Sequence, residues 1–223
     1  MKLEKEFTNN ITIIGSYHSE IGMCNPSELY RIIEIFKPDV IFEELPTNVF
    51  YSIYSGRHPP NTVESKAVSA YIKNNNPKHF PVDTYSYDFD KIFSEYELLF
   101  QFDDNYEIIF TELIKNIQQY GFKFLNSSRC TKKITELKRL ELKILTDNCS
   151  KELLTKYLQE EEIHDKREWE ILKNIYNYSI NNPFNNAILI CGTDHKKGLL
   201  EKLNHNSFKD KTMINWLHMH HDE

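Results

Sequence analysis

The sequence is poor in glycine and lacks the paired cysteines of metal ribbons and disulfide scaffolds. Only six of its 223 residues are glycine, which argues against a fold made mainly of tight turns. The four cysteines stand singly, with no Cys-x-x-Cys spacing, at Cys24, Cys130, Cys149 and Cys191. This spacing fits neither a zinc ribbon nor a secreted disulfide framework, and it indicates a reducing compartment.

Two other absences exclude classes of partner. The formal net charge is −6, and no continuous basic stripe interrupts the mixture of acidic and basic residues, so we expect no nucleic-acid partner. No apolar run approaches the length that crosses a membrane. Residues 1–7 lack the apolar core and cleavage site of a signal peptide. We therefore expect a soluble cytoplasmic protein without a membrane partner.

The sequence does contain enough apolar material for a well-filled core. Hydrophobic residues make up 40% of the chain and aromatic residues 13%, mostly Tyr and Phe, and this composition predicts folding rather than disorder. A length of 223 residues suits one core. We expect a single domain over residues 1–223 that carries a sizeable insertion.

Short apolar runs alternate with helical patterns, which predicts an α/β fold. We expect a central sheet, mostly parallel or mixed, flanked by helices. The expected core strands are residues 11–14, 39–46, 79–83 and 187–191, with a last strand at 212–217. The expected helices are residues 25–37, 62–73, 162–180 and 196–203, and residues 47–61 are expected to be turn-rich.

Residues 90–160 show the spacing of large apolar side chains that is typical of helices. We expect this stretch to form a helical insertion between the third and fourth core strands. Its acidic, Tyr- and Phe-rich surface suits either a homodimer interface or a cover for a pocket, and periodicity does not choose between the two.

Ionisable residues follow each predicted core strand. In a parallel sheet, the ligand site lies outside the carboxyl ends of the strands. We therefore expect one polar active site at this edge. The side chains that the strands bring there are His18 after the first strand, Glu43 and Glu44 on the second, Asp83 on the third and His195 after the fourth.

Gly15 and Gly192 each follow a buried strand and begin a Gly-x-x-His segment. We expect each glycine to permit a sharp turn and the close approach of a ligand. Arg167 should lie near Gly192 at the carboxyl edge of the sheet. About thirteen residues of helix after Arg167 lead roughly 20 Å away from this edge, and a five-residue strand then leads roughly 17 Å back to it. The alternative for Arg167 is an exposed ion-pair network on its own helix, with Glu161, Glu162, Glu168 and Glu170.

Two neutral imidazoles and a carboxylate are a ligand set for a divalent metal such as zinc, manganese or cobalt. We expect His18, Glu44 and His195 to hold such an ion. The metal would lower the pKa of a bound water or polarise a carbonyl, and Arg167 would stabilise the developing negative charge. This chemistry corresponds to hydrolysis.

The general base of such a reaction is expected to be Glu43 or Asp83. Strand alternation points Glu43 and Glu44 to opposite faces of the sheet, so only one of them faces the metal, and we assign Glu44 to that role. Asp83 has an alternative role as the cap of the following turn.

The motif residues also resemble a known family. Gly15-Ser-Tyr-His18, Glu44-Leu45 after a buried strand, Arg167, and Gly192-Thr-Asp-His195 followed by Gly198 look like the TraB/PrgY/GumN and Tiki group. The resemblance covers roughly residues 10–46 and 160–217, and it extends more distantly to erythromycin esterase and ChaN-type proteins. It implies a similar site here, since Tiki members are described as divalent-metal proteases and PrgY as reducing a peptide pheromone signal.

Two features depart from that family. Thr84 follows Asp83 where the family often has an arginine, which puts anion or substrate recognition at that position in doubt. We also expect no signal peptide or membrane anchor, so membrane-tethered proteolysis is not expected to carry over.

Three functions follow from these patterns. The first is a metal-dependent hydrolase acting on a peptide or an ester. The second is a regulatory module that binds a peptide or small molecule in the same pocket without turnover. The third is a metal-independent hydrolase, similar to erythromycin esterase, in which a histidine activates water directly. A di-iron site is not favoured, because Glu161-x-x-His164 occurs once and such sites need two copies.

Overall fold

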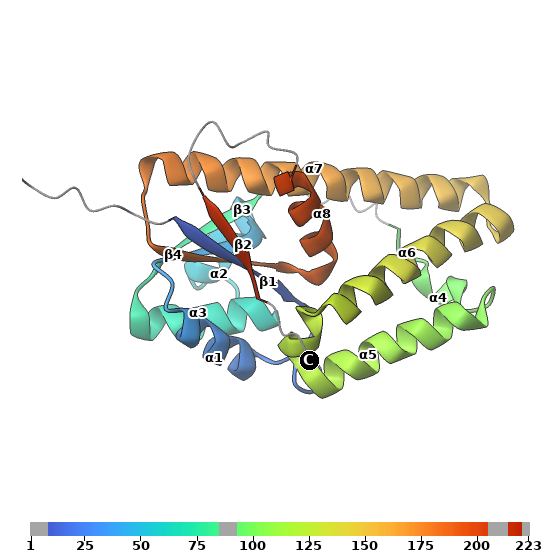
Figure 1. The fold of residues 1–223 in the computed structure, drawn as a ribbon, viewed down its shortest axis with the longest axis horizontal. Coiled ribbons are helices and arrows are strands. Elements are labelled where there is room, and N and C mark those ends of the chain that lie inside the picture. Colours follow the sequence, from blue (N-terminus) through green and yellow to red (C-terminus); the bar gives the residue numbers. More distant parts are fainter. Residues whose placement is uncertain (1–8, 85–92, 205–213, 220–223) are drawn as a thin grey trace, which may run out of the picture.

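The computed structural model describes residues 9–84, 93–204 and 214–219. Five described strands form one sheet in the order β3-β2-β4-β1-β5, and every neighbouring pair is parallel (Figure 1). This confirms the α/β fold and selects the parallel alternative over the mixed one. The strands are β1 (Asn10–Ser16), β2 (Val40–Pro46), β3 (Lys78–Asp83), β4 (Asn186–Gly192) and β5 (Asn215–His218).

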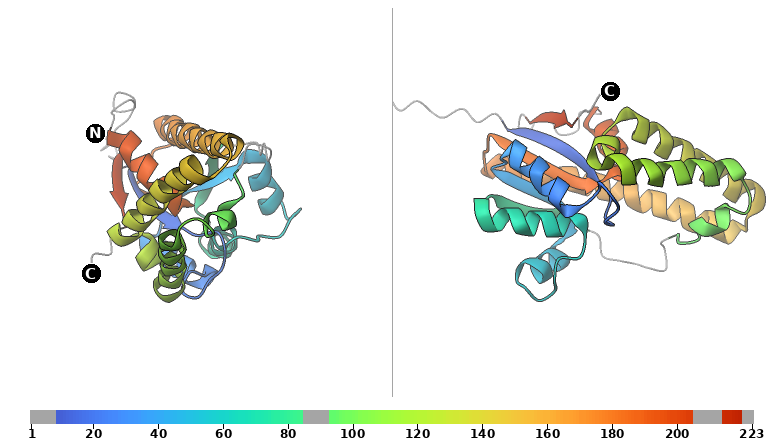
Figure 2. Two further views of the ribbon diagram at one scale, coloured as in Figure 1. Left: turned by 90° about the vertical axis from the view of Figure 1, so that its right-hand side faces the viewer. Right: turned by 90° about the horizontal axis from the view of Figure 1, so that it is seen from below.

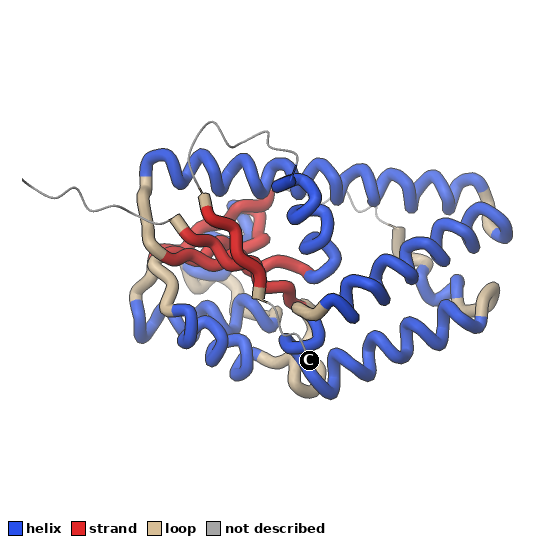
Figure 3. Tube along the Cα trace, in the orientation of Figure 1, coloured by secondary structure: helices blue, strands red, loops and turns tan. Residues whose placement is uncertain are grey.

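Helices cover both faces of the sheet (Figure 3). On one face, Ile14, Ile41 and Ile188 pack in a core with α1 (Pro26–Phe36) and α3 (Val63–Asn75). On the other face, Ile13, Phe42 and Leu189 pack with α7 (Lys151–Asn181) and α8 (Thr193–Asn204). Neighbouring residues of each strand therefore point to opposite cores, as the pleat requires.

Local sequence signals start the two helices of the first face. The side chain of Asn25 accepts a hydrogen bond from the Glu28 backbone N–H, 3.1 Å long, and Pro26 occupies the first turn of α1. Thr62 and Ser65 form a reciprocal capping box at the start of α3. Such caps satisfy backbone N–H groups that have no partner inside the helix.

The predicted helical insertion lies between β3 and β4. It consists of α4 (Tyr96–Leu99), α5 (Asp104–Leu125), α6 (Ser128–Asn148) and the first half of α7. Figure 2 shows these helices projecting beyond one end of the sheet. The predicted boundary at residue 160 was wrong, because α7 is one helix of 31 residues whose sequence contains neither glycine nor proline to interrupt it.

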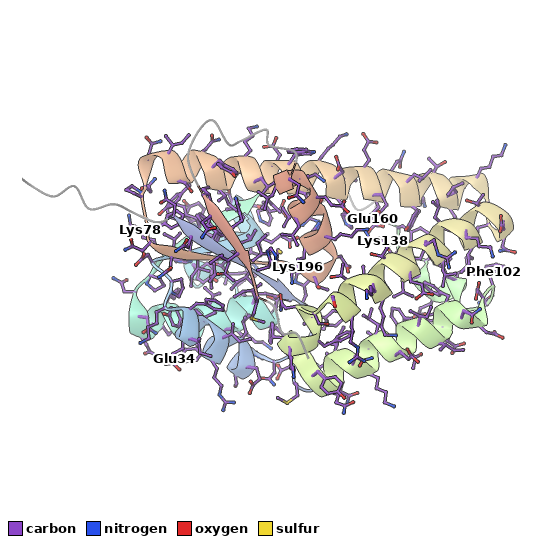
Figure 4. The ribbon with its side chains drawn as sticks, viewed as in Figure 1. Glu34, Lys78, Phe102, Lys138, Glu160 and Lys196 are labelled. Carbon is purple, nitrogen blue, oxygen red and sulfur yellow. The ribbon has the colours of Figure 1, made fainter. Side chains whose placement is uncertain are left out.

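The insertion is fastened to the sheet by Asn126, which lies between α5 and α6. Its side chain accepts a hydrogen bond of 2.8 Å from the Gly15 N–H and donates one of 3.0 Å to the Gly15 carbonyl. The buried Lys196 of α8, labelled in Figure 4, donates to both oxygens of Asn126 at 3.2 Å. The insertion is thereby held at the carboxyl end of β1.

Four other elements differ from the prediction. Residues 47–54 form α2 (Thr47–Tyr54) rather than a turn, because Phe50 and Ile53 bury one side of a short helix that begins directly after Pro46. The strand β1 continues through Gly15, and α8 begins at Thr193 rather than residue 196. The last strand begins at Asn215, and residues 212–213 of the predicted strand lie outside the described ranges.

Within residues 9–84, 93–204 and 214–219, no helix is both long enough and apolar enough to cross a bilayer.

Candidate functional site

Glu44 is the central carboxylate at the carboxyl edge of the sheet. Its side chain is 5% exposed. Oε2 accepts a hydrogen bond of 2.6 Å from the Gly192 N–H, at the start of α8, and Oε1 accepts one of 2.6 Å from Arg167 Nη2. His195 Nε2 lies 3.2 Å from the same Oε1. Burial raises the pKa of Glu44, but His195, Arg167 and the Gly192 N–H outweigh it and lower the pKa to about 2.

Arg167 joins Glu44 to Asp83. Its Nη2 donates to Asp83 Oδ2 at 2.7 Å, and its Nε donates to the same oxygen at 3.2 Å. The Asp83 side chain is 2% exposed and the Arg167 side chain 17%. Arg167 thus pairs with carboxylates on two strands, which is the geometry expected from the helix and strand lengths. Asp83 closes β3 as predicted, and its contact positions the guanidinium.

His195 lies between two carboxylates. Its Nδ1 is 3.1 Å from Glu168 Oε1, opposite the Nε2 that faces Glu44. Burial lowers the pKa of His195, but the charge of Glu44 and the contact with Glu168 outweigh it and raise the pKa to about 9. Glu168 in turn accepts a hydrogen bond of 2.8 Å from Lys202 Nζ. The imidazole is therefore oriented at both ring nitrogens.

Gly198 makes the contact between Glu168 and His195 possible. A Cβ at position 198 would lie 1.9 Å from Glu168 Oε2 and 2.5 Å from its Cδ. Such distances are far below van der Waals contact, so the carboxylate would have to move away. The Glu168 carboxylate reaches His195 because position 198 has no side chain.

Gly198→Ala is expected to release His195 from Glu168. The pKa of His195 should fall from about 9, and any metal affinity or activity that depends on this imidazole should drop roughly 10- to 100-fold. Histidine resonances followed by NMR through a pH titration measure the first effect directly. Lys197→Ala, on the exposed side of the same helix turn, is the control. An unchanged His195 titration in Gly198→Ala would contradict the assigned contact.

His18 has a similar anchor on the other side of the site. Its Nδ1 lies 3.2 Å from Glu64 Oε1, and its side chain is 59% exposed. Glu64 raises the pKa of His18. The two carboxylate oxygens of Glu64 are buried and accept no hydrogen bond of good geometry from the described residues. Burial raises the pKa of Glu64, but the contact with His18 outweighs it and lowers the pKa, so Glu64 is an ionised carboxylate that orients the His18 ring.

His18, Glu44 and His195 converge on Gly192. A Cβ at that position would lie 3.5 Å from His18 Nε2, 3.6 Å from Glu44 Oε2 and 3.7 Å from His195 Cδ2. The chain turns from β4 into α8 directly after Gly192, whereas the turn predicted at Gly15 was wrong, because β1 continues through Gly15 to Ser16. Neither glycine has a positive φ. The physical reason for these glycines is that neighbouring groups approach the backbone closely at both positions. A Cβ at position 15, for example, would lie 3.1 Å from Thr193 Oγ1.

Glu43 belongs to the opposite face of β2. Its Oε2 accepts a hydrogen bond of 2.5 Å from the Tyr54 hydroxyl, and its Oε1 lies 3.3 Å from His79 Nδ1. Burial raises the pKa of Glu43. The carboxylate still borders a cavity of about 300 Å³ that His18, Glu44, Glu64, Asp83 and Arg167 also line. Glu43 is therefore beside the site without contacting its central ion pairs.

Three polar residues of this region were not assigned from the sequence: Glu64, Glu168 and His164. Glu64 and Glu168 hold the Nδ1 atoms of the two motif histidines. His164 packs edge-on against His195, with ring centroids 4.8 Å apart. Burial lowers the pKa of His164 to about 3, so this imidazole is neutral at physiological pH.

The site offers suitable donors for a divalent metal ion. Each of the two imidazoles is held at Nδ1 by a glutamate and directs its other edge toward Gly192, as in carboxylate–histidine–metal sites. Glu44 lies between them. In the part of the chain that the structure describes, however, no three such donors stand close enough to form a ready metal site. The residues fit a metal in their chemistry and orientation, and coordination would require His195 Nε2 to release the proton that its contact with Glu44 favours.

The two Gly-x-x-His segments, Gly15 to His18 and Gly192 to His195, thus meet at one edge of the sheet. Comparison of the chain with models of protein families, with curated proteins and with solved structures found no match. The family resemblance therefore depends on the motif residues themselves, and the function has to be argued from the geometry of this site.

Proposed function

We propose that this chain is a hydrolase that activates water between His18 and His195. The observation that carries the proposal is the pair of glutamate-anchored imidazoles, which approach Gly192 from two sides with Glu44 between them. Two oriented imidazoles and a carboxylate are the donors of metal-assisted hydrolytic sites. The bond that fits this chemistry is a peptide or ester bond.

His18, Glu44 and His195 would hold the metal, with manganese, cobalt or zinc as candidates. When bound, such an ion lowers the pKa of water and polarises a carbonyl group. Glu64, whose Oε1 lies 3.2 Å from His18 Nδ1, would keep the other ring nitrogen of His18 directed toward the metal. Arg167 borders the same cavity and would stabilise negative charge on the carbonyl oxygen.

A metal-free hydrolase is the second candidate, and the Glu64–His18 contact favours it. An exposed imidazole oriented by a carboxylate is the arrangement of a general base that takes a proton from water directly. In this route Glu64 orients His18 and the leaving group receives the proton.

The test is elemental analysis of untagged protein, metal titration by calorimetry, and a hydrolysis screen with peptides and esters. We expect near-stoichiometric metal and turnover in the wild type, and loss of both in His18→Ala and His195→Ala. His58→Ala, at an exposed histidine that contacts Ser52, is the matched control. Turnover without metal supports the second candidate, and ligand binding without turnover indicates a regulatory module. Unchanged metal binding and activity in both variants would exclude the shared centre.

A further inference from the structure

The helical insertion contains a cavity of about 330 Å³, separate from the cavity beside Glu44. α5, α6 and α7 enclose it, together with the first turn of α8. Its apolar wall comes largely from α5, through Phe110, Leu113, Ile114 and Ile117. The volume is within the range of small-molecule sites, about 300–1,000 Å³.

Negative charge predominates at the polar end of this cavity. Lys138 is the only lysine or arginine among the described residues that line it, and its Nζ lies 2.9 Å from Glu161. Three further carboxylates line the cavity: Glu141, Glu160 and Asp194. Figure 4 shows Lys138 and Glu160 in the space between α6 and α7. Glu141 and Glu160 are buried, whereas Asp194 is exposed, so a bound cation would balance the charge of the two buried carboxylates.

One carboxylate oxygen is placed to receive such a cation. Glu160 Oε2 accepts hydrogen bonds from the Phe93 N–H and the Tyr96 hydroxyl. Oε1 accepts none from the described residues and lies 3.8 Å from His164 Nε2. In Glu141, by contrast, Tyr106 and Tyr157 each donate to one oxygen. Burial raises the pKa of Glu160, as expected for a carboxylate that lacks a close positive partner.

We propose that this cavity binds an apolar compound that carries a protonated amine. The ammonium group donates to Glu160 Oε1 and lies beside Tyr96, whose hydroxyl contacts the same carboxylate, while Tyr17 also lines the cavity. Aromatic faces attract cations electrostatically. The apolar body of the ligand packs against the α5 wall, so both parts of the compound are matched by the cavity.

The position of His164 connects this ligand to the candidate centre. The His164 ring contacts His195, with centroids 4.8 Å apart, and it also lines the cavity next to Glu160. An amine held at Glu160 therefore lies one imidazole away from His195.

Calorimetric titration with a matched pair of probes, 4-phenylbutylamine and 4-phenylbutan-1-ol, tests the cavity without requiring turnover. We expect the wild type to bind the amine at least tenfold more tightly than the alcohol. Glu160→Gln should abolish most of that preference. Glu162→Gln, at an exposed carboxylate of the same helix, should retain it. Leu113→Trp, which fills the apolar wall, should weaken both probes, with circular dichroism as the check on folding.

The outcomes separate this inference from the proposed function. Equal binding of the two probes, no binding of either, or equal effects of Glu160→Gln and Glu162→Gln would overturn the amine site. Selective amine binding in a chain that hydrolyses nothing would support the cavity and reject the hydrolase.

Discussion

Replacing Arg167 with methionine is expected to destabilise the folded chain by about 3–5 kcal/mol. Methionine keeps much of the apolar stem but removes the guanidinium that Glu44 and Asp83 share, and both of these carboxylates are almost fully buried. A buried charge that loses its partner costs far more than an exposed one. Urea unfolding at pH 7 measures the difference in free energy.

Arg31→Met is the matched control for this experiment. Arg31 pairs with Glu28 across one turn of α1, and its side chain is 70% exposed. The loss there should be within about 1 kcal/mol. Similar losses for the two variants would show that the Arg167 pairs are solvated, and would contradict the buried ion-pair arrangement.

The second large effect is a pH dependence of stability that comes from Glu44 and His195. The pKa of Glu44 is lowered to about 2, so its stabilisation is present above its ordinary pKa of 4.5 and is lost as the pH falls toward 2. The pKa of His195 is raised to about 9, so its stabilisation is present below 6.5 and is lost as the pH rises through 9. The pair therefore stabilises the fold most between about pH 4.5 and 6.5.

For His195, a pKa of about 9 against an ordinary value of 6.5 corresponds to about 3 kcal/mol. The free energy of unfolding, measured in urea with a chelator present, should fall between pH 6 and pH 10 by about this much more in the wild type than in His195→Gln. His58→Gln should follow the wild type. Parallel profiles for the wild type and His195→Gln would mean that His195 is not held between two carboxylates.

The fold could be predicted from the sequence because the apolar residues of the strands and long helices recur with clear periodic spacing. The core strands were located to within two residues at each end by their apolar runs, such as residues 187–191 for β4. The helix α2 was missed because the turn residues after Tyr54 dominate that stretch, while burial of Phe50 and Ile53 depends on packing. The length of α7 was underestimated because the first part of its helical pattern was assigned to the insertion and the rest to a separate helix of the core.

Only part of the candidate site could be predicted from the sequence. Strand alternation distinguishes Glu44 from Glu43, and the lengths of helix and strand bring Arg167 to the sheet edge. Glu168 and Glu162 look alike in the sequence, yet the Glu168 side chain is 8% exposed and the Glu162 side chain 64%. Which acidic residue of a helix is buried depends on tertiary packing, so Glu168 and Glu64 could not be assigned from sequence patterns.

The continuity of α7 limits how the protein can be divided into modules. The helix is about 46 Å long for its 31 residues, and it carries Glu160 and His164 on the insertion side and Arg167 and Glu168 nearer the sheet. Excising the whole insertion would therefore cut through a helix that supplies both cavities. A variant that carries a different helical insertion on this sheet would have to exchange α5 and α6 while keeping α7 intact.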